Sequence, residues 1–248
     1  MFDPGRKNKS LWGGLLFILI LSTSSVAFAS AILPEPEAAS YSSTSPIVYL
    51  NKDLFPEPEP LKPMVNFWIN IYTRYEASDV VIHDTKNLDI VYEVVDLNLK
   101  LGPAASRRAK NRYMEKRRKH YAKILKRLGR QKGRCNNIDE CFVAALFGNK
   151  TDGSTYYKAA RRVRTQFGLA TRFLKGIETS GLYMNEMRVI FTENSLPLEL
   201  LALPHVESSF NVNAYSKHGA AGIWQFTRST GRRFMKINYT YDERLDPI

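Results

Sequence analysis

Apolar residues spaced three and four positions apart are the feature of this chain that most constrains its fold. Between Tyr157 and Glu178 the stripe consists of Ala160, Val163, Phe167, Ala170, Leu174 and Ile177. This spacing is typical of an amphipathic helix, so we predict one helix from Tyr157 to Glu178, ended by Gly181. A second stripe, which ends near Asn194, consists of Tyr183, Met187, Ile190 and Phe191. These patterns predict a mainly helical, all-α fold.

Helical spacing also extends toward the N-terminus, where a core begins at Val65. One helical face there would carry Phe67, Trp68, Ile71, Tyr72 and Tyr75. The runs 80–82 and 90–95 are rich in β-branched residues and could be strands. However, Leu88, Val91, Tyr92, Val95 and Leu99 also follow helical spacing, and we favour a helix that ends at Gly102-Pro103.

The stretch from Arg107 to Arg134 contains most of the chain's excess positive charge. It holds fourteen Lys and Arg residues and one acid, Glu115, a net +13; since the whole chain carries +12, the remainder carries −1. A narrow apolar stripe formed by Met114, Tyr121, Ile124, Leu125 and Leu128 predicts one long basic helix within residues 104–134. Its cationic faces could contact an anionic membrane or wall polymer, or could simply be solvated.

The first thirty residues have the order expected of an export signal. Arg6, Lys7 and Lys9 precede the apolar run 11–21, and Ala27-Phe28-Ala29 precedes a cleavage site before Ser30. An uncleaved membrane anchor over 11–29 is the alternative, because this stretch approaches the ~20 residues that span a bilayer. In both cases the remainder is exported to the periplasm or cell envelope, so we expect no nucleic-acid partner.

Residues 30–63 predict an extended linker. Prolines alternate with glutamates at 34–37 and 56–60, and a Ser-rich patch covers 40–45. Closely spaced prolines remove backbone donors and block helix formation. We expect this segment to act as a tether.

Cys135 and Cys141 are the two cysteines of the chain. In an oxidising compartment they could close a short disulfide loop, which would require a turn because an i, i+6 pair points to different faces of a helix. Gly133 and Asn136-Asn137 could supply that turn. No set of Cys and His residues completes a four-ligand zinc site, so we expect no metal and no cofactor.

Two glutamates in the segment 196–210 have different surroundings. Pro197 suits a first helical turn with Ser195 as a possible cap, so Glu199 is expected to stabilise the positive end of that helix. Glu207 instead has Leu203, Pro204 and Phe210 at i−4, i−3 and i+3. Burial on this stripe would raise the pKa of Glu207, as a general acid needs. A buried carboxylate satisfied by the backbone or by an arginine such as Arg228 is an equally good interpretation of this local pattern.

The residues after Glu207 favour the catalytic interpretation. The polar segment 211–217, which includes Ser216, is followed by Gly219-Ala220-Ala221-Gly222-Ile223-Trp224-Gln225-Phe226. Small residues let a backbone approach a bulky ligand, whereas Trp224 and Gln225 offer a stacking face and an amide. Sugars are bound by such pairs, so we expect Trp224 and Gln225 to contact a sugar substrate.

Taken together, these residues resemble the lytic transglycosylases with an SLT-type domain, in particular the membrane-bound murein transglycosylase D group. The matching pieces are Leu196-Pro197 with Glu199-Leu200, the Glu207-Ser208 pair, the block 219–226 and Asp242-Glu243-Arg244-Leu245-Asp246-Pro247. The match is strong from about Gly181 to the end of the chain. Such order and spacing are specific, although each piece alone would be a weak signal.

The resemblance implies a lysozyme-like α fold that cleaves peptidoglycan glycan strands between N-acetylmuramic acid and N-acetylglucosamine. Glu207 would protonate the leaving oxygen and then accept the proton of the muramoyl 6-hydroxyl, which closes a 1,6-anhydro ring. Ser208 would lie beside the acid, and Gln225 with the backbone 222–226 would line the glycan cleft. The resemblance thus implies that the substrate is bound by Ser208, Ser216, Gly222, Trp224 and Gln225. We expect Asp242, Glu243 and Asp246 to form an ion pair with Arg244 at a helix entry rather than to supply the second carboxylate of ordinary glycosidases.

The expected organisation is a signal peptide (1–29), a linker (30–63), a helical N-terminal region (64–180) and the first part of a lysozyme-like domain (181–248). Family members continue through further helices, so we expect this chain to be a fragment or a truncated form with little activity of its own. A non-catalytic glycan-binding module and a cationic envelope-surface protein are the competing functions. The motifs do not decide between transglycosylase and hydrolytic lysozyme chemistry.

Overall fold

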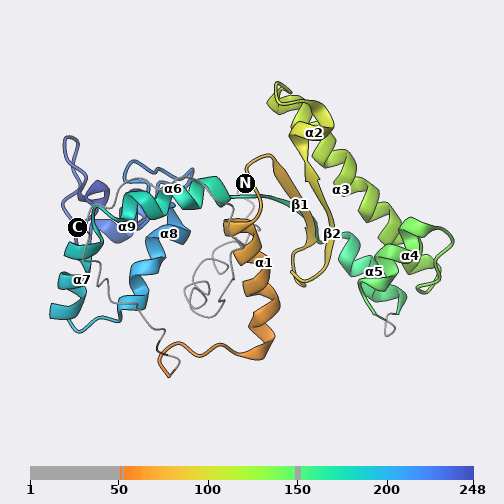
Figure 1. Ribbon diagram of the computed structural model, residues 1–248, viewed down its shortest axis with the longest axis horizontal. Coiled ribbons are helices and arrows are strands. Elements are labelled where there is room, and N and C mark those ends of the chain that lie inside the picture. The colour runs from red at the N-terminus through yellow and green to blue at the C-terminus, as the bar shows by residue number, and fades with distance from the viewer. Residues whose placement is uncertain (1–50, 52, 149–151) are drawn as a thin grey trace, which may run out of the picture. The chain divides into compact units, whose positions relative to one another are not determined.

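The computed structural model describes residues 51, 53–148 and 152–248. The expected signal peptide and most of the expected linker lie outside these residues. The described chain forms two compact units, which we call the sheet unit (Pro58–Glu178) and the C-terminal unit (Thr179–Ile248, with the described residues before Pro58). Figure 1 shows the elements of each unit.

The sheet unit contains a three-stranded antiparallel sheet that the sequence analysis did not favour. Its strands are β1 (Asp79–Asp84), β2 (Val91–Asp96) and β3 (Val163–Phe167), in the order β2-β1-β3. Val80 pairs with Val95 of β2 and with Phe167 of β3. The helix expected around residues 88–99 is therefore wrong, and the fold is mainly helical rather than all-α.

Strand β1 is buried on both faces, and a register shift between Ile82 and His83 lets Tyr92 and Val95 of β2, three residues apart, pack into the same core and so imitate helical spacing. Val80 and Ile82 pack into a core with Ile124 of α3 (Arg107–Arg130), whereas Val81 packs on the other face with Ile71 of α1 (Lys62–Thr73). A strand covered on both faces is apolar at successive positions, so its sequence lacks the alternation that identifies a strand with one wet face. A short 3-10 turn, η1 (Glu59–Leu61), precedes α1.

The single helix expected from Tyr157 to Glu178 is also wrong. The segment forms the end of α5 (Gly153–Ala160), then strand β3, then the greater part of α6 (Ala170–Ser180). Gly168 lies at the break, where an added Cβ would lie only 2.1 Å from the Tyr75 carbonyl oxygen. Pairing with β1 and this close backbone approach override the helical spacing of the apolar residues.

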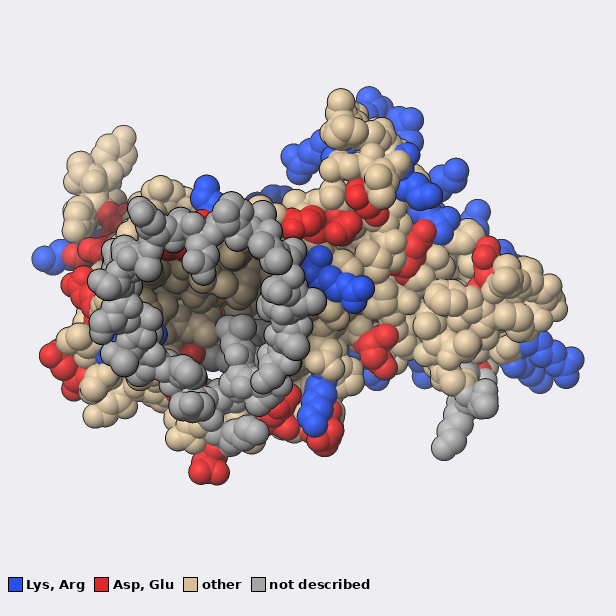
Figure 2. Space-filling view, viewed as in Figure 1, with Lys and Arg blue, Asp and Glu red and all other residues tan. Residues whose placement is uncertain are grey.

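Helix α3 covers one face of the sheet with a narrow apolar stripe. Tyr121, Ile124, Leu125 and Leu128 are buried, and they pack with α5 and α4 (Ile138–Ala145) in the same core. Ser106 caps the helix through the amide of Ala109, and the short helix α2 (Leu97–Leu101) precedes it. Lys and Arg side chains gather along α3 in Figure 2. The helix lies within the stretch 104–134, where a basic helix is expected.

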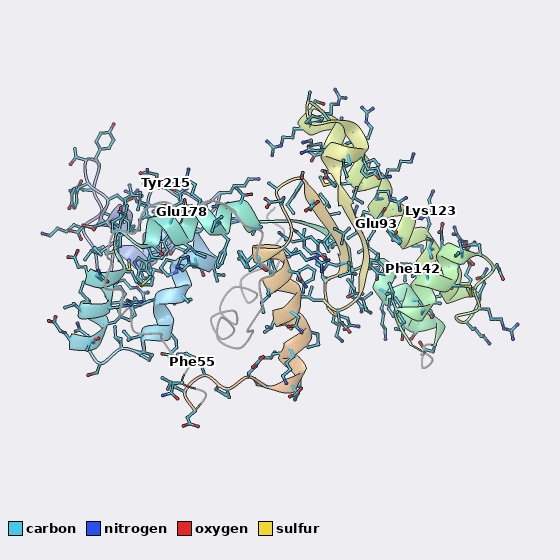
Figure 3. All side chains as sticks on the ribbon, viewed as in Figure 1. Phe55, Glu93, Lys123, Phe142, Glu178 and Tyr215 are labelled. Carbon is cyan, nitrogen blue, oxygen red and sulfur yellow. A yellow bond between two sulfur atoms is a disulfide. The ribbon has the colours of Figure 1, made fainter. Side chains whose placement is uncertain are left out.

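Cys135 and Cys141 form a disulfide just beyond α3 (Figure 3). Their Cα atoms are 5.0 Å apart, and Asn137 caps α4 between them by accepting a hydrogen bond from the amide of Glu140. Gly133, with φ of +82°, reverses the chain after α3. The cysteines are therefore joined across a turn and a helix start.

The C-terminal unit has short elements around a small core. They are α7 (Met184–Glu193), the 3-10 turn η2 (Leu198–Ala202), α8 (Leu203–Glu207), α9 (Arg228–Gly231) and η3 (Glu243–Leu245). Met187, Leu201, Phe210 and Ile223 form the buried core. Helix α7 agrees with the stripe expected up to Asn194. Ser195 does not cap η2; Pro197 occupies the cap position, and no side chain caps it.

Within the described residues, none of the helices is long and apolar enough to cross a membrane. The possible anchor over residues 11–29 lies outside the part of the chain that the structure describes.

Candidate active site

Glu207 is the last residue of α8, and its position differs from the one expected. The buried stripe of this segment consists of Leu201, Pro204, His205 and Ser208. Glu207 flanks the stripe and is exposed. The expectation of a fully buried acid is therefore wrong, because the irregular 3-10 to α transition and the turn after Glu207 shift which positions face the core.

The carboxyl of Glu207 nevertheless has a raised pKa. Although the residue is exposed as a whole, enough protein surrounds its carboxyl to disfavour the ionised form, and this desolvation raises the pKa above the usual glutamate range. A carboxyl that a ligand can reach and that keeps its proton to a higher pH can act as a general acid.

The backbone turns sharply directly after Glu207. Ser209 and Phe210 both adopt positive φ, 56° and 54°, which residues with side chains rarely do. The amides of Ser209 and Phe210 donate to the carbonyls of His205 and Pro204, which closes the end of α8. Phe210, only 1% exposed, fills the core below the turn. Packing thus holds a strained backbone next to the candidate acid, as is frequent at functional sites.

Ser208 fastens this turn to the loop that follows in the sequence. Its hydroxyl, 2% exposed, lies 3.0 Å from the Ile223 carbonyl and 3.2 Å from the Pro204 carbonyl, and it accepts from the Asn211 amide. The neighbour of Glu207 in the chain therefore contacts the expected substrate-binding loop 219–226. The hydroxyl is committed to the backbone, which indicates a positioning role for Ser208.

Ser216 shapes the entry to that loop. Its hydroxyl accepts from the amides of His218 and Ala220, and its own amide donates to the Ala220 carbonyl at 2.8 Å. Short bridges then pair Tyr215 with Ala221, and Ala221 with Phe226. Ser216 therefore organises the turn from which the loop begins.

Gly222 lies where this loop crosses the backbone of η3. An added Cβ would lie 1.6 Å from the Arg244 carbonyl oxygen, and Gly222 has φ of +73°. Its amide donates to the Ala214 carbonyl at 2.9 Å. Glycine is required at this position, but the requirement is close backbone packing inside the protein.

Arg244 is the centre of a clamp that sequence reasoning missed. It is 3% exposed, pairs with Asp242 at 2.6 Å, and donates to the carbonyls of Gly219 and Phe226 at 2.8 and 3.0 Å. It thereby holds both ends of the block 219–226. The only signal in the sequence was the expected Asp242–Arg244 ion pair, which the structure confirms; the two loop carbonyls could not be identified without the tertiary structure.

Asp242 is committed to this clamp. It also caps η3 through the Arg244 amide, and the Arg244 guanidinium lowers its pKa to about 2. A carboxylate this acidic stays ionised near neutral pH and is a poor proton donor. Asp242 is therefore unsuited to act as a second catalytic acid.

Trp224 and Gln225 are half-buried in the same loop. The Trp224 ring stacks on Phe191 of α7, with centroids 6.1 Å apart and planes 11° from parallel. Gln225 has φ of +54°, and its amide nitrogen donates to the Gly222 carbonyl at 2.8 Å and lies 3.3 Å from the Ala214 carbonyl. Much of the bonding capacity of both side chains is used to shape the loop.

His205 belongs to the core. It is 9% exposed, its ring lies against Phe210 with centroids 4.7 Å apart, and burial lowers its pKa. Arg228, the expected alternative partner of Glu207, begins α9, and the pKa of Glu207 is shifted by burial alone. Within the residues described, no group of three His, Cys, Asp or Glu side chains could hold a metal ion.

The region that contains Glu207 and the loop 219–226 is similar in sequence to known proteins. Residues 190–248 match the family model described as the transglycosylase SLT domain. The membrane-bound lytic murein transglycosylase D of Escherichia coli (strain K12) is 46% identical over 57 residues, which cover 23% of this chain and 13% of that protein. A protein named for tributyltin chloride resistance, from Alteromonas sp. (strain M-1), is 42% identical over 57 residues, 28% of its length.

The aligned stretch thus spans less than a third of each of these relatives. No significant match to a solved structure was found. The matched residues include Glu207, Ser208, the loop 219–226 and the Asp242–Arg244 clamp. Residues 190–248 are therefore similar in sequence to an SLT-type transglycosylase domain.

Proposed function

We propose that this chain contributes the acid-bearing part of a peptidoglycan lytic transglycosylase. The reaction would cleave the β-1,4 bond between N-acetylmuramic acid and N-acetylglucosamine and form 1,6-anhydro-N-acetylmuramic acid. The observation that carries the proposal is a ligand-accessible Glu207 with a raised pKa, joined through Ser208 to the loop 219–226. The similarity to a murein transglycosylase over this same stretch supports it.

Glu207 would act twice in this mechanism. As an acid it donates its proton to the glycosidic oxygen while the bond to the muramoyl carbon breaks, and the leaving N-acetylglucosamine end keeps that proton. As a base it then takes the proton of the muramoyl 6-hydroxyl, whose oxygen bonds to the same carbon. Glu207 is restored and no water is consumed, so one carboxyl suffices.

The hydrogen bonding and the low pKa of Asp242 support a mechanism that uses a single carboxyl group. Hydrolytic glycosidases generally use a pair of carboxyl groups, one of which activates water or attacks the sugar. Both carboxylate oxygens of Asp242 accept hydrogen bonds from Arg244, and a pKa of about 2 makes this carboxylate a weak base, so it is poorly suited to that second role. It would serve the reaction indirectly by holding the loop on which the sugar lies.

The loop residues would divide the work of substrate binding. Trp224 can offer the part of its ring that Phe191 leaves open, and Gln225 its amide oxygen, to a sugar. Gly222 lets the loop approach η3 closely, and Ser208 and Ser216 fix its shape through backbone hydrogen bonds. Glycan strands of the cell envelope are the proposed substrate, which fits the export expected from the N-terminal sequence.

Replacing Glu207 by Gln in the natural full-length protein tests this assignment. The isosteric amide keeps the shape of the site but cannot release a proton, so we expect at least a ~100-fold loss of anhydro-muropeptide release from sacculi, measured by mass spectrometry of the products. Binding of the variant to sacculi should remain.

Glu199→Gln is the matched control, because Glu199 lies in the same segment and accepts a hydrogen bond from the Asn51 amide. It should keep most of the activity. Undiminished release by the Glu207 variant would reject the role of Glu207. Products with a reducing muramic acid end would indicate hydrolysis instead, and sacculus binding without any release by the parent protein would indicate a glycan-binding module.

The raised pKa of Glu207 also predicts the pH profile. The acid form is needed for the first step and is lost as the pH rises through this pKa, so activity should fall on the alkaline side. In a Glu207→Asp variant, that alkaline limb should move, whereas it should not move in the Glu199→Gln control.

A further inference from the structure

One face of helix α3 carries only cations. At about 100° per residue, a strip about 80° wide along the helix contains seven positions, and all seven are Lys or Arg. They are Arg108, Arg112, Lys116, Lys119, Lys123, Lys126 and Arg130. All are exposed, and they lie opposite the buried stripe formed by Tyr121, Ile124, Leu125 and Leu128. We call these seven residues the cationic row.

The acidic residues near α3 form ion pairs mainly with cations on the flanks of the helix, and hardly neutralise the cationic row. Glu93 of β2 pairs with Arg117 at 2.7 Å, and Glu140 of α4 pairs with Arg127 at 2.7 Å. Glu115 holds Arg118 with two hydrogen bonds and lies 3.4 Å from Lys119. Among the described residues, this last contact is the only ion pair that involves the row. Figure 3 shows Glu93 on the side of α3 that faces the sheet, with Lys123 on the outer side.

Such a row of like charges destabilises the helix. Neighbours along the row are three or four residues apart, the spacing at which like charges repel each other on a helix. A merely solvated face needs no such pattern, because mixed charges would solvate it and also form favourable pairs. The uniform sign therefore indicates a ligand that carries many negative charges.

The shape of the row favours a flat ligand. From Arg108 to Arg130 it extends ~33 Å at about 1.5 Å per residue, along the outer ridge of a straight helix. Cations on a ridge can all meet a surface at once, whereas a polymer strand is usually held in a groove. The apolar stripe of α3 is occupied by the core, so binding would involve no insertion into lipid tails.

We propose that the cationic row docks the sheet unit on the phosphate-bearing surface of an anionic phospholipid bilayer. The N-terminal sequence supports this choice of partner, because an export signal would carry the chain across a membrane into the compartment that this membrane bounds, and an uncleaved anchor would hold it there. Lys and Arg near an anionic leaflet contribute additively to binding, and the attraction falls off within a Debye length. The inference is independent of the transglycosylase proposal.

Vesicle co-sedimentation of the natural full-length protein tests the proposal. The probes are vesicles of phosphatidylcholine alone and vesicles that also contain phosphatidylglycerol, whose head group is anionic. The readout is the difference in binding between the two vesicle types, so any contribution of an apolar N-terminal segment cancels. Replacing Arg112, Lys116, Lys119 and Lys123 by Gln should reduce this difference at least tenfold. Raising the salt concentration should do the same for the parent protein.

A matched variant removes four exposed cations elsewhere in the sheet unit, by replacing Lys86, Lys100, Lys158 and Arg161 with Gln. It loses the same net charge and should bind nearly as the parent does. Equal losses in both variants, or no preference of the parent for anionic vesicles, would overturn the proposal. Row-dependent binding of soluble polyphosphate without vesicle binding would also overturn it, in favour of a polymer ligand.

Folding does not confound this test. The row variant relieves repulsion between like charges on α3 and should melt at the same temperature as the parent or higher. Circular dichroism checks this directly. The row lies outside the candidate active site, so anhydro-muropeptide release from soluble glycan fragments should be unchanged in the variant.

Discussion

The sheet unit and the C-terminal unit are stabilised in different ways. The sheet unit has a 24-residue helix and three paired strands, with a buried core on each face of the sheet. In the C-terminal unit, the four elements after α7 have at most five residues each, and side chains bonded to the backbone hold the loops between them. The part that carries the candidate chemistry therefore depends on single hydrogen bonds and on one close glycine contact.

This difference predicts that most single changes will be tolerated better by the sheet unit. Its many apolar contacts each contribute a small part of the stability, so the loss of one is tolerated. In the C-terminal unit, a loop that loses the side chain bonded to its backbone has no equivalent contact to replace it. The following changes test the contrast, and the first is the exception that we expect within the sheet unit.

Replacing Asp84 by Ala should have the largest effect. Asp84 has no exposed surface and forms an ion pair at 2.8 Å with Arg162, which directly precedes β3. It also accepts hydrogen bonds from the amides of Lys86 and Asn87. Its removal leaves a poorly solvated guanidinium, which should lower the free energy of unfolding by about 3–5 kcal/mol. Urea denaturation followed by circular dichroism measures this loss. Glu115→Ala, which removes an exposed ion pair, should cost under about 1 kcal/mol; similar losses in both would contradict the argument.

Replacing Gly222 by Ala should be the most damaging change in the C-terminal unit. The new Cβ would overlap the Arg244 carbonyl and sit at positive φ, so we expect a loss of about 2–4 kcal/mol and of enzymatic activity. Gly219→Ala is the control, since Gly219 also has positive φ but nothing lies within 4 Å of its added Cβ. It should cost only about 1 kcal/mol. Scanning calorimetry compares the two variants, and equal costs would refute the importance of the contact.

Replacing Cys135 and Cys141 together by Ser should lower the stability of the sheet unit by about 2 kcal/mol, the chain-entropy value for so short a loop. The C-terminal unit and its activity should be unaffected. Thermal unfolding with and without reductant gives the measurement. If reductant shifts the melting of the double Ser variant, the disulfide is not the source of the change.

The Asp242–Arg244 pair predicts a smaller effect that depends on pH. The pKa of Asp242 is about 2 in the folded chain and 3.8 ordinarily. A carboxyl whose pKa is lower in the folded chain than in the unfolded chain stabilises the fold at pH values above its ordinary pKa. This stabilisation is lost as the pH falls from about 4 to about 2. Asp242→Asn should therefore cost about 1–2 kcal/mol at pH 6 and little at pH 2. A cost that does not change with pH would show that packing, and not charge, accounts for it.

Sequence spacing predicted the elements that pack through one face. Helix α7 and the basic helix α3 each place one apolar stripe on a core, which is the situation that helical periodicity describes. It failed for all three strands. Val80 to Ile82 is buried on both faces, Tyr92 and Val95 of β2 pack into one core although they are three residues apart, and residues 163–167 belong to a strand whose pairing partner lies about 80 positions away. Local spacing contains no information about that partner.

The candidate site likewise has features that the sequence predicted and features that it did not. The motif residues from Glu207 to Gln225 were identified because their order and spacing resemble those of the SLT-type family. The exposure of Glu207 was not predicted, because the change from the 3-10 turn η2 to α8 interrupts the regular helical spacing on which the expectation was based. The backbone-directed bonds of Ser208 and Gln225 were likewise invisible in the sequence.

The sequence by itself determined the family resemblance, the identity of the candidate acid and the uniform charge of one face of α3, since each depends on residue type and local spacing. The tertiary structure alone decided which segments became strands, how far Glu207 is exposed, and that Arg244 holds the loop 219–226. The physical reason is that pairing, burial and buried hydrogen bonds depend on groups that are distant in the chain and meet only on folding.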